Sequence, residues 1–108
     1  MENYLIDKNA TIKQALNKLS VCGEKCIIVV NKQNILQGTL SDGDIRKFII
    51  NHKSLSNKIS NIYNKNPKKF LIKNYNDSKI EHYFINLRLE VIPIVDKNNK
   101  VVDAVLFS

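Results

Sequence analysis

The 108-residue chain repeats one order of expected elements at a constant spacing, and this repeat restricts the folds open to it. The segment Val30-Asn31-Lys32-Gln33-Asn34 aligns with Val95-Asp96-Lys97-Asn98-Asn99, an offset of 65 residues. In both places an apolar run rich in β-branched residues precedes a polar turn, as in a buried strand that enters a hairpin. A repeat of this length indicates two similar units that share a core.

Apolar periodicity predicts a β-α-β-β-α order for the first unit. The expected strands lie at 4–6, 26–30 and 35–40, and the expected helices at 11–19 and 44–50. Thr11, or Asn9 before it, is a suitable N-cap for the first helix, and Gly23 is a natural stop after it. The continuous apolar run at 26–30 predicts a strand that is buried on both faces.

The second unit is expected to repeat this order without its last helix. The expected strands lie at 70–72, 91–95 and 100–107, and a helix opened by Asp77 or Ser78 runs through 87. We therefore expect three parts, namely a first unit at 1–50, a linker with one short docking helix at 51–66 and a second unit at 67–108. Because nothing after Ser108 matches the helix at 44–50, we also expect a piece of a longer polypeptide.

Composition restricts the partners. The net charge of +7 comes from scattered lysines without a run of five basic residues, and aromatic residues make up only 7% of the chain. This pattern predicts a solvated surface that favours anions, and no nucleic-acid partner. Cys22 and Cys26 are expected to be reduced, packed thiols, with no metal site. The absence of a signal-type or membrane-length apolar segment predicts a cytoplasmic protein with no membrane partner.

The stretch Gly38-Thr39-Leu40-Ser41-Asp42-Gly43-Asp44-Ile45 runs from an expected strand into a helix start. Backbone N–H groups at a helix N-terminus attract anions. The Ser41 hydroxyl is able to donate to a phosphate, and the Asp44 carboxylate to accept from ribose hydroxyls. A purely structural interpretation is also open, in which Ser41 caps the helix and Asp44 favours its positive end.

Two such units, with the Gly38–Asp44 motif and the run Ile92-Pro93-Ile94-Val95-Asp96, resemble a tandem CBS domain pair, also called a Bateman module. The resemblance covers essentially the whole chain. It implies an α/β (α+β) fold of two β-α-β-β-α repeats packed with pseudo-two-fold symmetry. The segment Gly-Thr-Leu-Ser-Asp-Gly-Asp-Ile-Arg at 38–46 further resembles the corresponding segment of modules that precede bacterial sugar-phosphate nucleotidyltransferase domains.

The resemblance implies a regulatory module that binds an adenine nucleotide of the AMP, ADP or ATP class, or S-adenosylmethionine, at one site. It implies neither catalytic residues nor a required cofactor in this part of the chain. Ser41 would meet phosphate and Asp44 the ribose, and the rest of the expected site comprises Gly38, Thr39, Gly43, Ile6, Cys26 and Ile27, with the backbone near the last three beside the base. In the second unit Asp103 stands at the glycine position and Leu106 at the hydroxyl position, so we expect one site at most.

Other functions find less support. The chain has no Ser/His/Asp set and no Gly-x-x-x-x-Gly-Lys phosphate loop, which argues against an enzyme. Calcium is disfavoured because most acidic ligands of a calcium loop are missing. The main rival is a ligand-free homodimerisation or scaffold module, for which Phe48, Ile49, Tyr83 and Phe84 are interface candidates as well as core candidates.

One feature of the motif opposes an anionic ligand. The charges of Asp42 and Asp44 at the helix start repel a phosphate, unless Asp42 points to solvent or a basic side chain compensates it. Arg46 and Lys47 are the nearby basic residues that would add positive charge at the phosphate end.

Overall fold

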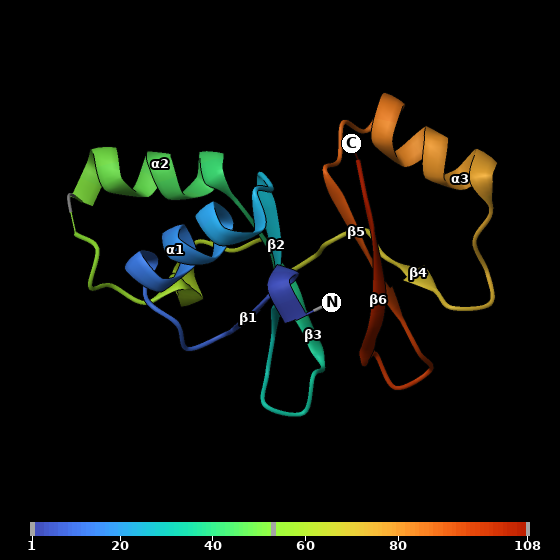
Figure 1. The fold of residues 1–108 in the computed structure, drawn as a ribbon, viewed down its shortest axis with the longest axis horizontal. Helices are drawn as coiled ribbons and strands as arrows, with labels where there is room; N and C mark the ends of the chain where they lie inside the picture. Colours follow the sequence, from blue (N-terminus) through green and yellow to red (C-terminus); the bar gives the residue numbers. More distant parts are fainter. Residues whose placement is uncertain (1, 53, 108) are drawn as a thin grey trace.

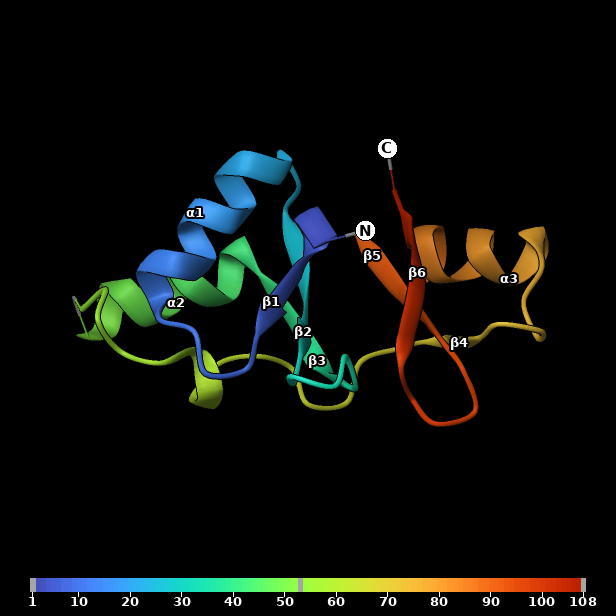
Figure 2. The same cartoon turned by 60° about the horizontal axis from the view of Figure 1, so that its bottom comes forward.

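Two three-stranded sheets stand side by side in the middle of the molecule, and the helices lie on the outer sides (Figure 1). The computed structural model describes residues 2–52 and 54–107. The molecule measures 41 × 30 × 23 Å along its principal axes. Two helices cover the first sheet and one covers the second, as the view turned by 60° also shows (Figure 2).

The first sheet has the strand order β1-β2-β3, with β1 parallel and β3 antiparallel to β2. A 3-10 turn (Glu2–Tyr4) precedes β1, so the first strand begins one residue later than predicted. The elements are β1 (Leu5–Asp7), α1 (Ile12–Cys22), β2 (Cys26–Val30), β3 (Leu36–Ser41) and α2 (Asp42–His52). This is the predicted order, and α2 begins two residues earlier than predicted.

The second sheet has the equivalent order β4-β5-β6. Its elements are β4 (Phe70–Leu71), α3 (Asp77–Glu81), a π-helical continuation η3 (His82–Asn86), β5 (Val91–Val95) and β6 (Val101–Leu106). Asp77 is the first helical residue, and Asn76 before it caps the helix by accepting from the Lys79 N–H at 2.9 Å. A π-helical turn is not visible in the sequence pattern, because it depends on where the side chains pack.

The caps of α1 form as predicted. The Gln14 N–H donates to the Thr11 hydroxyl at 3.2 Å, and the Thr11 N–H donates to the Gln14 side chain at 2.9 Å, which completes a capping box. Asn9 does not cap the helix, since its N–H donates to the Asp7 carboxylate in the preceding turn. Gly23 ends α1 with a φ of 71°, a left-handed conformation that favours glycine.

The two hairpin turns show the repeat at atomic detail. Asn34 and Asn99, which are related by the 65-residue offset, both have a positive φ, of 66° and 64°. The Leu36 N–H donates to the Asn99 carbonyl at 2.9 Å, and the Val101 N–H donates to the Asn34 carbonyl at 2.9 Å. These two bonds are exchanged reciprocally by equivalent residues, so the sheets are related by a pseudo-two-fold axis that passes between the turns.

Three apolar clusters form the core. The first lies between the first sheet and its two helices and includes Ile12, Ile27 and Ile45. The second joins the two sheets and includes Ile28, Val91 and Val95. The third lies beneath α3 and includes Phe70, Phe84 and Ile92. Phe48 and Ile49 pack partly buried against the first cluster and Tyr83 against the third, and Phe84 is buried. All four interface candidates therefore pack against the core. No helix in the described ranges is long and apolar enough to cross a membrane.

The segment between the two sheets is bound to the first one. Ile59, in a short 3-10 turn (Ile59–Asn61), is fully buried in the first cluster, and its N–H donates to the Ala10 carbonyl at 2.9 Å. Further along, Thr39 of β3 and Asn64 exchange two backbone hydrogen bonds of 3.1 and 2.8 Å. The segment thus crosses to the second sheet along the edge of β3.

Candidate functional site

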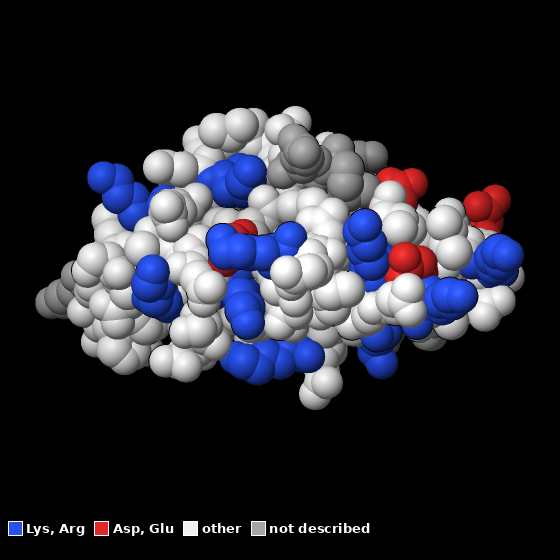
Figure 3. All heavy atoms as spheres, turned by 90° about the horizontal axis from the view of Figure 1, so that it is seen from below, with Lys and Arg blue, Asp and Glu red and all other residues white. Residues whose placement is uncertain are grey.

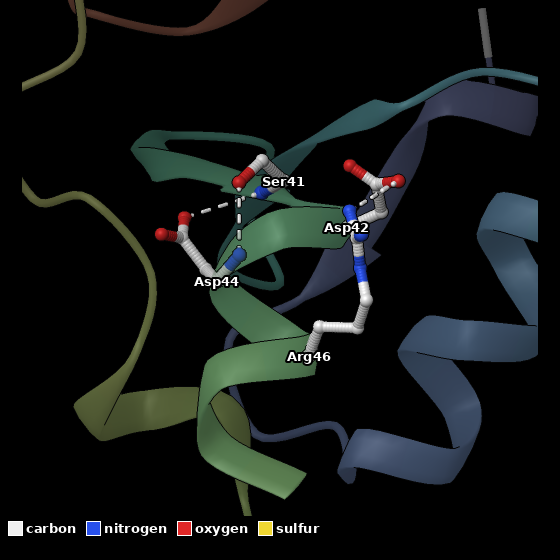
Figure 4. Close-up of polar contacts among 4 residues, drawn as sticks. All are labelled: Ser41, Asp42, Asp44 and Arg46. Atoms are coloured by element: carbon white, nitrogen blue, oxygen red, sulfur yellow. Dashed lines mark hydrogen bonds and ion pairs between the residues drawn. The ribbon is translucent and has the colours of Figure 1, made fainter. Parts of the chain in front are cut away.

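The end of β3 and the start of α2 bring Ser41 and Asp44 together. The Asp44 N–H donates to the Ser41 hydroxyl oxygen at 3.1 Å, and the Ser41 N–H donates to an Asp44 carboxylate oxygen at 3.4 Å (Figure 4). This reciprocal pair is a capping box of the same kind as that of α1. Ser41 and Asp44 therefore do cap the helix, as the structural interpretation of the motif predicts, and this cap explains why α2 begins at Asp42.

Asp42 forms an ion pair with Arg46 one helical turn later, with 3.2 Å between the guanidinium nitrogen and the carboxylate oxygen. Figure 4 shows this pair on the side of the helix start away from Ser41 and Asp44. A basic side chain thus compensates the carboxylate that opposes an anion. Both side chains are well exposed, so the pair contributes little to stability.

The two glycines of the motif serve different purposes. A Cβ on Gly38 would lie 2.1 Å from the Asn64 carbonyl oxygen and 2.5 Å from the Tyr63 ring. A Cβ on Gly43 would meet only the Ser41 hydroxyl oxygen, at 3.7 Å. Gly38 is therefore needed for the close approach of the linker to β3, whereas Gly43 leaves the space in front of the Ser41 hydroxyl open.

The strand register decides which expected site residues face the second sheet. Cys26 lies opposite Ser41, and Ile28 lies opposite Thr39, so all four side chains share the face that meets the second sheet. Ile6 and Ile27 are buried in the cluster beneath α1 and α2. Their side chains therefore point away from Ser41, and only their backbone lies in the same sheet.

The pKa of the Cys26 thiol reflects its burial and the charges around it. Burial, and to a smaller extent the nearby carboxylates of Glu90 and Asp44, together raise the pKa of its thiol to about 12. The thiol is therefore protonated at neutral pH. Glu90 comes from the loop before β5, so the second half of the chain places a carboxylate near the motif, which sequence reasoning missed.

A cleft of about 280 Å³ lies between the two sheets beside the motif. We call it the inter-sheet cleft; it is lined by Thr39, Asn64, Asn66, Pro67, Lys68, Leu87, Leu89 and Val91. Thr39 is the one contribution from the first sheet, and Ser41 projects from the same face of β3 two residues later. The facing wall comes from the linker and from the second half of the chain.

This facing wall was not predicted. The predicted neighbours of Ser41, Cys26 and Ile27, belong to its own unit. The cleft is instead lined by Val91 of the second unit, which is equivalent to Cys26 after the 65-residue offset. The pseudo-two-fold axis is the reason, because it sets the end of β3 against the β4–β5 side of the other unit. The sequence signal that could have identified Val91 is the repeat itself, because adding the 65-residue offset to Cys26 gives Val91.

The equivalent position in the second unit lacks the motif. Asp103 is exposed, and its carboxylate accepts the N–H of the next residue, Ala104, at 2.8 Å. Leu106 packs partly buried against the cluster between the sheets. Among residues 2–52 and 54–107, no three His, Cys, Asp or Glu side chains gather in a group able to hold a metal ion.

No protein-family model matches the chain. An uncharacterized protein of Helicobacter pylori is 31% identical over 99 residues, which cover 90% of this chain and 30% of that protein. The chloride channel protein CLC-f of Arabidopsis thaliana is 35% identical over 54 residues, which cover 49% of this chain and 7% of the channel. The chain thus spans about a third of the length of its Helicobacter relatives.

Solved structures of CBS domains match the fold over nearly the whole chain. The CBS domains of a transcriptional regulator from Streptococcus pneumoniae superpose with a TM-score of 0.80 at 19% identity, over 97% of this chain and 84% of that one. A CBS domain protein from Pyrobaculum aerophilum complexed with AMP superposes with a TM-score of 0.81 at 15% identity, over 94% of this chain and 78% of that one. The CBS domain pair of protein MJ0100, in complex with 5′-methylthioadenosine and S-adenosylmethionine, superposes with a TM-score of 0.80 at 20% identity, over 94% of this chain and 79% of that one. The protein therefore has the fold of a tandem CBS domain pair.

Proposed function

We propose that this protein is a regulatory, non-catalytic module that binds one adenine nucleotide of the AMP, ADP or ATP class at the inter-sheet cleft beside Ser41. The observation that carries the proposal is the hydroxyl–carboxylate pair of Ser41 and Asp44 at a helix start next to that cleft. Structures of the same fold that hold AMP, or 5′-methylthioadenosine with S-adenosylmethionine, support it.

The proposed contacts follow from the chemistry of each group. The Ser41 hydroxyl donates to a phosphate, and the Asp44 carboxylate accepts from the ribose hydroxyls. At the start of α2 the Asp42 N–H donates to the Lys25 carbonyl and the Asp44 N–H to the Ser41 hydroxyl oxygen, so the Gly43 N–H is the one of the first three that we assign to the phosphate. Pro67, Leu89 and Val91 give the cleft an apolar wall for the base, and Lys68 adds a positive charge. Asp44 has two oxygens, so it keeps its bond to the Ser41 N–H through one while the other binds the sugar.

Replacing Ser41 with alanine tests whether the motif does more than cap the helix. We expect a loss of about 1 kcal/mol in the free energy of unfolding, because a cap is removed, and a loss of about tenfold in nucleotide affinity, because a phosphate contact is removed. Thr11→Ala is the matched control, since it removes the capping box of α1. It should cost similar stability and leave the affinity unchanged.

The measurement is a thermal-shift and calorimetric titration with AMP, ADP, ATP and S-adenosylmethionine, because a ligand that binds only the folded protein raises its melting temperature. Asp44→Asn is added as a second variant, since it keeps the shape of the side chain and weakens the acceptor for ribose hydroxyls. Equal affinities in the wild type, Ser41→Ala and Asp44→Asn would restrict both residues to capping.

Cys26 offers an independent test of how the two halves of the chain meet. Because the Glu90 carboxylate helps to raise the Cys26 pKa toward about 12, Glu90→Gln is expected to lower it, although burial keeps it above the ordinary value of 9.0. The thiolate fraction, and hence the rate of iodoacetamide alkylation between pH 9 and 10, should rise. The raised pKa contributes stability that is complete below pH 9 and declines as the pH rises toward 12.

The alkylation rates are measured in a Cys22→Ala background, so that Cys26 is the one thiol that reacts. Glu24→Gln is the matched control, because Glu24 is a neighbouring carboxylate that has no part in the Cys26 shift. Equal rates in Glu90→Gln and Glu24→Gln would contradict the placement of Glu90 beside the motif. Protection of Cys26 by a saturating nucleotide would in addition support binding at this cleft.

A ligand-free dimerisation or scaffold module is the second candidate. It is favoured by the reciprocal Ser41–Asp44 hydrogen bonds, which satisfy both side chains without any ligand. It predicts no thermal shift with any adenosine compound, and a dimer by light scattering. A monomer without a thermal shift would exclude both candidates.

We further propose that the module acts in the cytoplasm as a homodimer, and that it controls a sugar-phosphate nucleotidyltransferase domain of a longer chain. The resemblance of the Gly38–Arg46 segment to such modules supports this, as does the greater length of the Helicobacter relatives. The test is whether full-length protein transfers a nucleotide to a sugar phosphate, and whether AMP changes that rate in the wild type but not in the Ser41→Ala variant.

A further inference from the structure

A second hollow adjoins the inter-sheet cleft along the linker. It has a volume of about 230 Å³ and shares Asn66, Pro67 and Lys68 with the cleft, and its remaining lining residues are Leu36, Gln37, Lys65, Lys69 and Asn99. These residues belong to the start of β3, the segment 65–69 before β4 and the β5–β6 turn. We call this hollow the lysine hollow, because three of its eight lining residues are lysines.

The lysine hollow carries positive charge that its own residues do not neutralise. Its lining residues include no carboxylate, and its other polar groups are the amides of Gln37, Asn66 and Asn99. The ion pair between Arg46 and Asp42 lies at the start of α2, and neither of its residues lines the hollow. Figure 3, which looks onto the face with the hairpin turns, shows lysines spread widely over this face and fewer acidic side chains.

Two of the ammonium groups are held in place by neutral partners. The Lys69 ammonium donates to the Asn99 side-chain oxygen at 2.7 Å, and Asn99 is itself fixed in the turn with a φ of 64°. The Lys65 ammonium donates to the Ser60 carbonyl at 2.6 Å and lies 4.4 Å from the centre of the Tyr63 ring. A carbonyl, an amide and an aromatic ring restrict these side chains without cancelling their charge. The three charges repel one another, and an anion in the hollow relieves that repulsion.

We propose that the lysine hollow binds a small polyphosphate anion, such as a free di- or triphosphate chain. Ammonium groups bind phosphate as point charges, and side-chain amides supply additional N–H donors. Only Leu36 and Pro67 of its lining residues are apolar, so the hollow lacks the apolar wall that the inter-sheet cleft offers to a base. The site therefore recognises phosphate groups and not a nucleoside.

The test is calorimetric titration of the chain with inorganic tripolyphosphate at low ionic strength. We expect saturable one-to-one binding that is weakened about threefold to tenfold in Lys65→Gln and in Lys69→Gln. Lys69→Arg keeps the charge and should retain most of the affinity. Lys32→Gln is the matched control, because Lys32 is an exposed lysine of the β2–β3 turn outside the hollow, and it should bind like the wild type.

Three outcomes of these tripolyphosphate titrations would overturn the proposal. The first is the absence of saturable binding. The second is equal affinities in Lys32→Gln and Lys69→Gln, which would indicate diffuse attraction to the whole basic face. The third is loss of tripolyphosphate binding in Ser41→Ala, which would move the anion to the inter-sheet cleft. Retained tripolyphosphate binding in Ser41→Ala keeps this inference separate from the nucleotide proposal, so either one can fail alone.

A single-stranded RNA oligonucleotide serves as the comparison ligand. Tight, steeply salt-dependent RNA binding that Lys32→Gln weakens as much as Lys69→Gln would assign the face to a nucleic acid and would also overturn the proposal. Circular dichroism of each variant checks the fold, which exposed lysine substitutions are expected to preserve.

Discussion

Replacement of Gly38 with alanine is expected to lower the free energy of unfolding by about 3 kcal/mol. The added Cβ would lie 2.1 Å from the Asn64 carbonyl oxygen, a backbone atom that cannot rotate away. To make room, the linker must leave β3, and it then loses the two hydrogen bonds between Thr39 and Asn64. A folded Gly38→Ala protein should also bind nucleotide more weakly, because the displaced linker lines the inter-sheet cleft.

Urea unfolding measures this effect, and Gly43→Ala is its matched control. Gly43 lies in the first turn of α2, where alanine has only part of the advantage of about 1 kcal/mol over glycine that it has in a helix interior. Its added Cβ would meet only the Ser41 hydroxyl oxygen at 3.7 Å. We therefore expect unchanged or slightly higher stability in Gly43→Ala. A Gly38→Ala protein as stable as Gly43→Ala would contradict the close contact between the linker and β3.

Replacement of Ile59 with alanine is expected to cost about 3–4 kcal/mol, within the range found when a fully buried isoleucine is truncated. Ile59 has no exposed surface and packs in the cluster between the first sheet and its helices, although it comes from the linker. Truncation leaves a cavity at the point where the linker is anchored. A loss of this size is a large part of the stability of a domain of about 100 residues.

Leu55→Ala is the control for Ile59→Ala, because Leu55 belongs to the same segment but is 44% exposed. It should cost less than about 1 kcal/mol. Chemical denaturation of both variants gives the comparison. If the two variants unfold at the same urea concentration, the linker does not contribute to the core, and its role would be reduced to a tether.

Local patterns were sufficient for most of the fold. The helices and strands of the first unit formed within three residues of their expected bounds, because each combines a clear apolar period with a cap or turn residue such as Thr11, Gly23 or Asn34. Asp42 and Gly43, expected before the helix, became its first turn, since Ser41 and Asp44 cap it together. The second unit was less regular, because its helix turns π-helical at His82–Asn86, where packing rather than propensity decides.

The candidate site was only partly accessible to sequence reasoning. The pairing of Ser41 with Asp44 is local, since three residues at a helix start set their distance. The neighbours of that pair are not local. Ile6 and Ile27 face the core beneath the helices, whereas Pro67, Leu89 and Val91 come from far along the chain and form the opposite wall. Strand register and the pseudo-two-fold axis decide this, and neither is encoded in one short segment.

By itself, the sequence determined the two-fold repeat of elements, the capping box at Ser41 and the lack of an equivalent motif at Asp103 and Leu106, because each depends on residues close together in the chain. Only the tertiary structure decided that the approach of the Asn64 carbonyl requires Gly38, that Glu90 lies near Cys26 and Asp44, and that three lysines of the segment before β4 line one hollow. These features arise where two sheets and a linker pack together, and the free energy of that packing is a sum over contacts between distant residues.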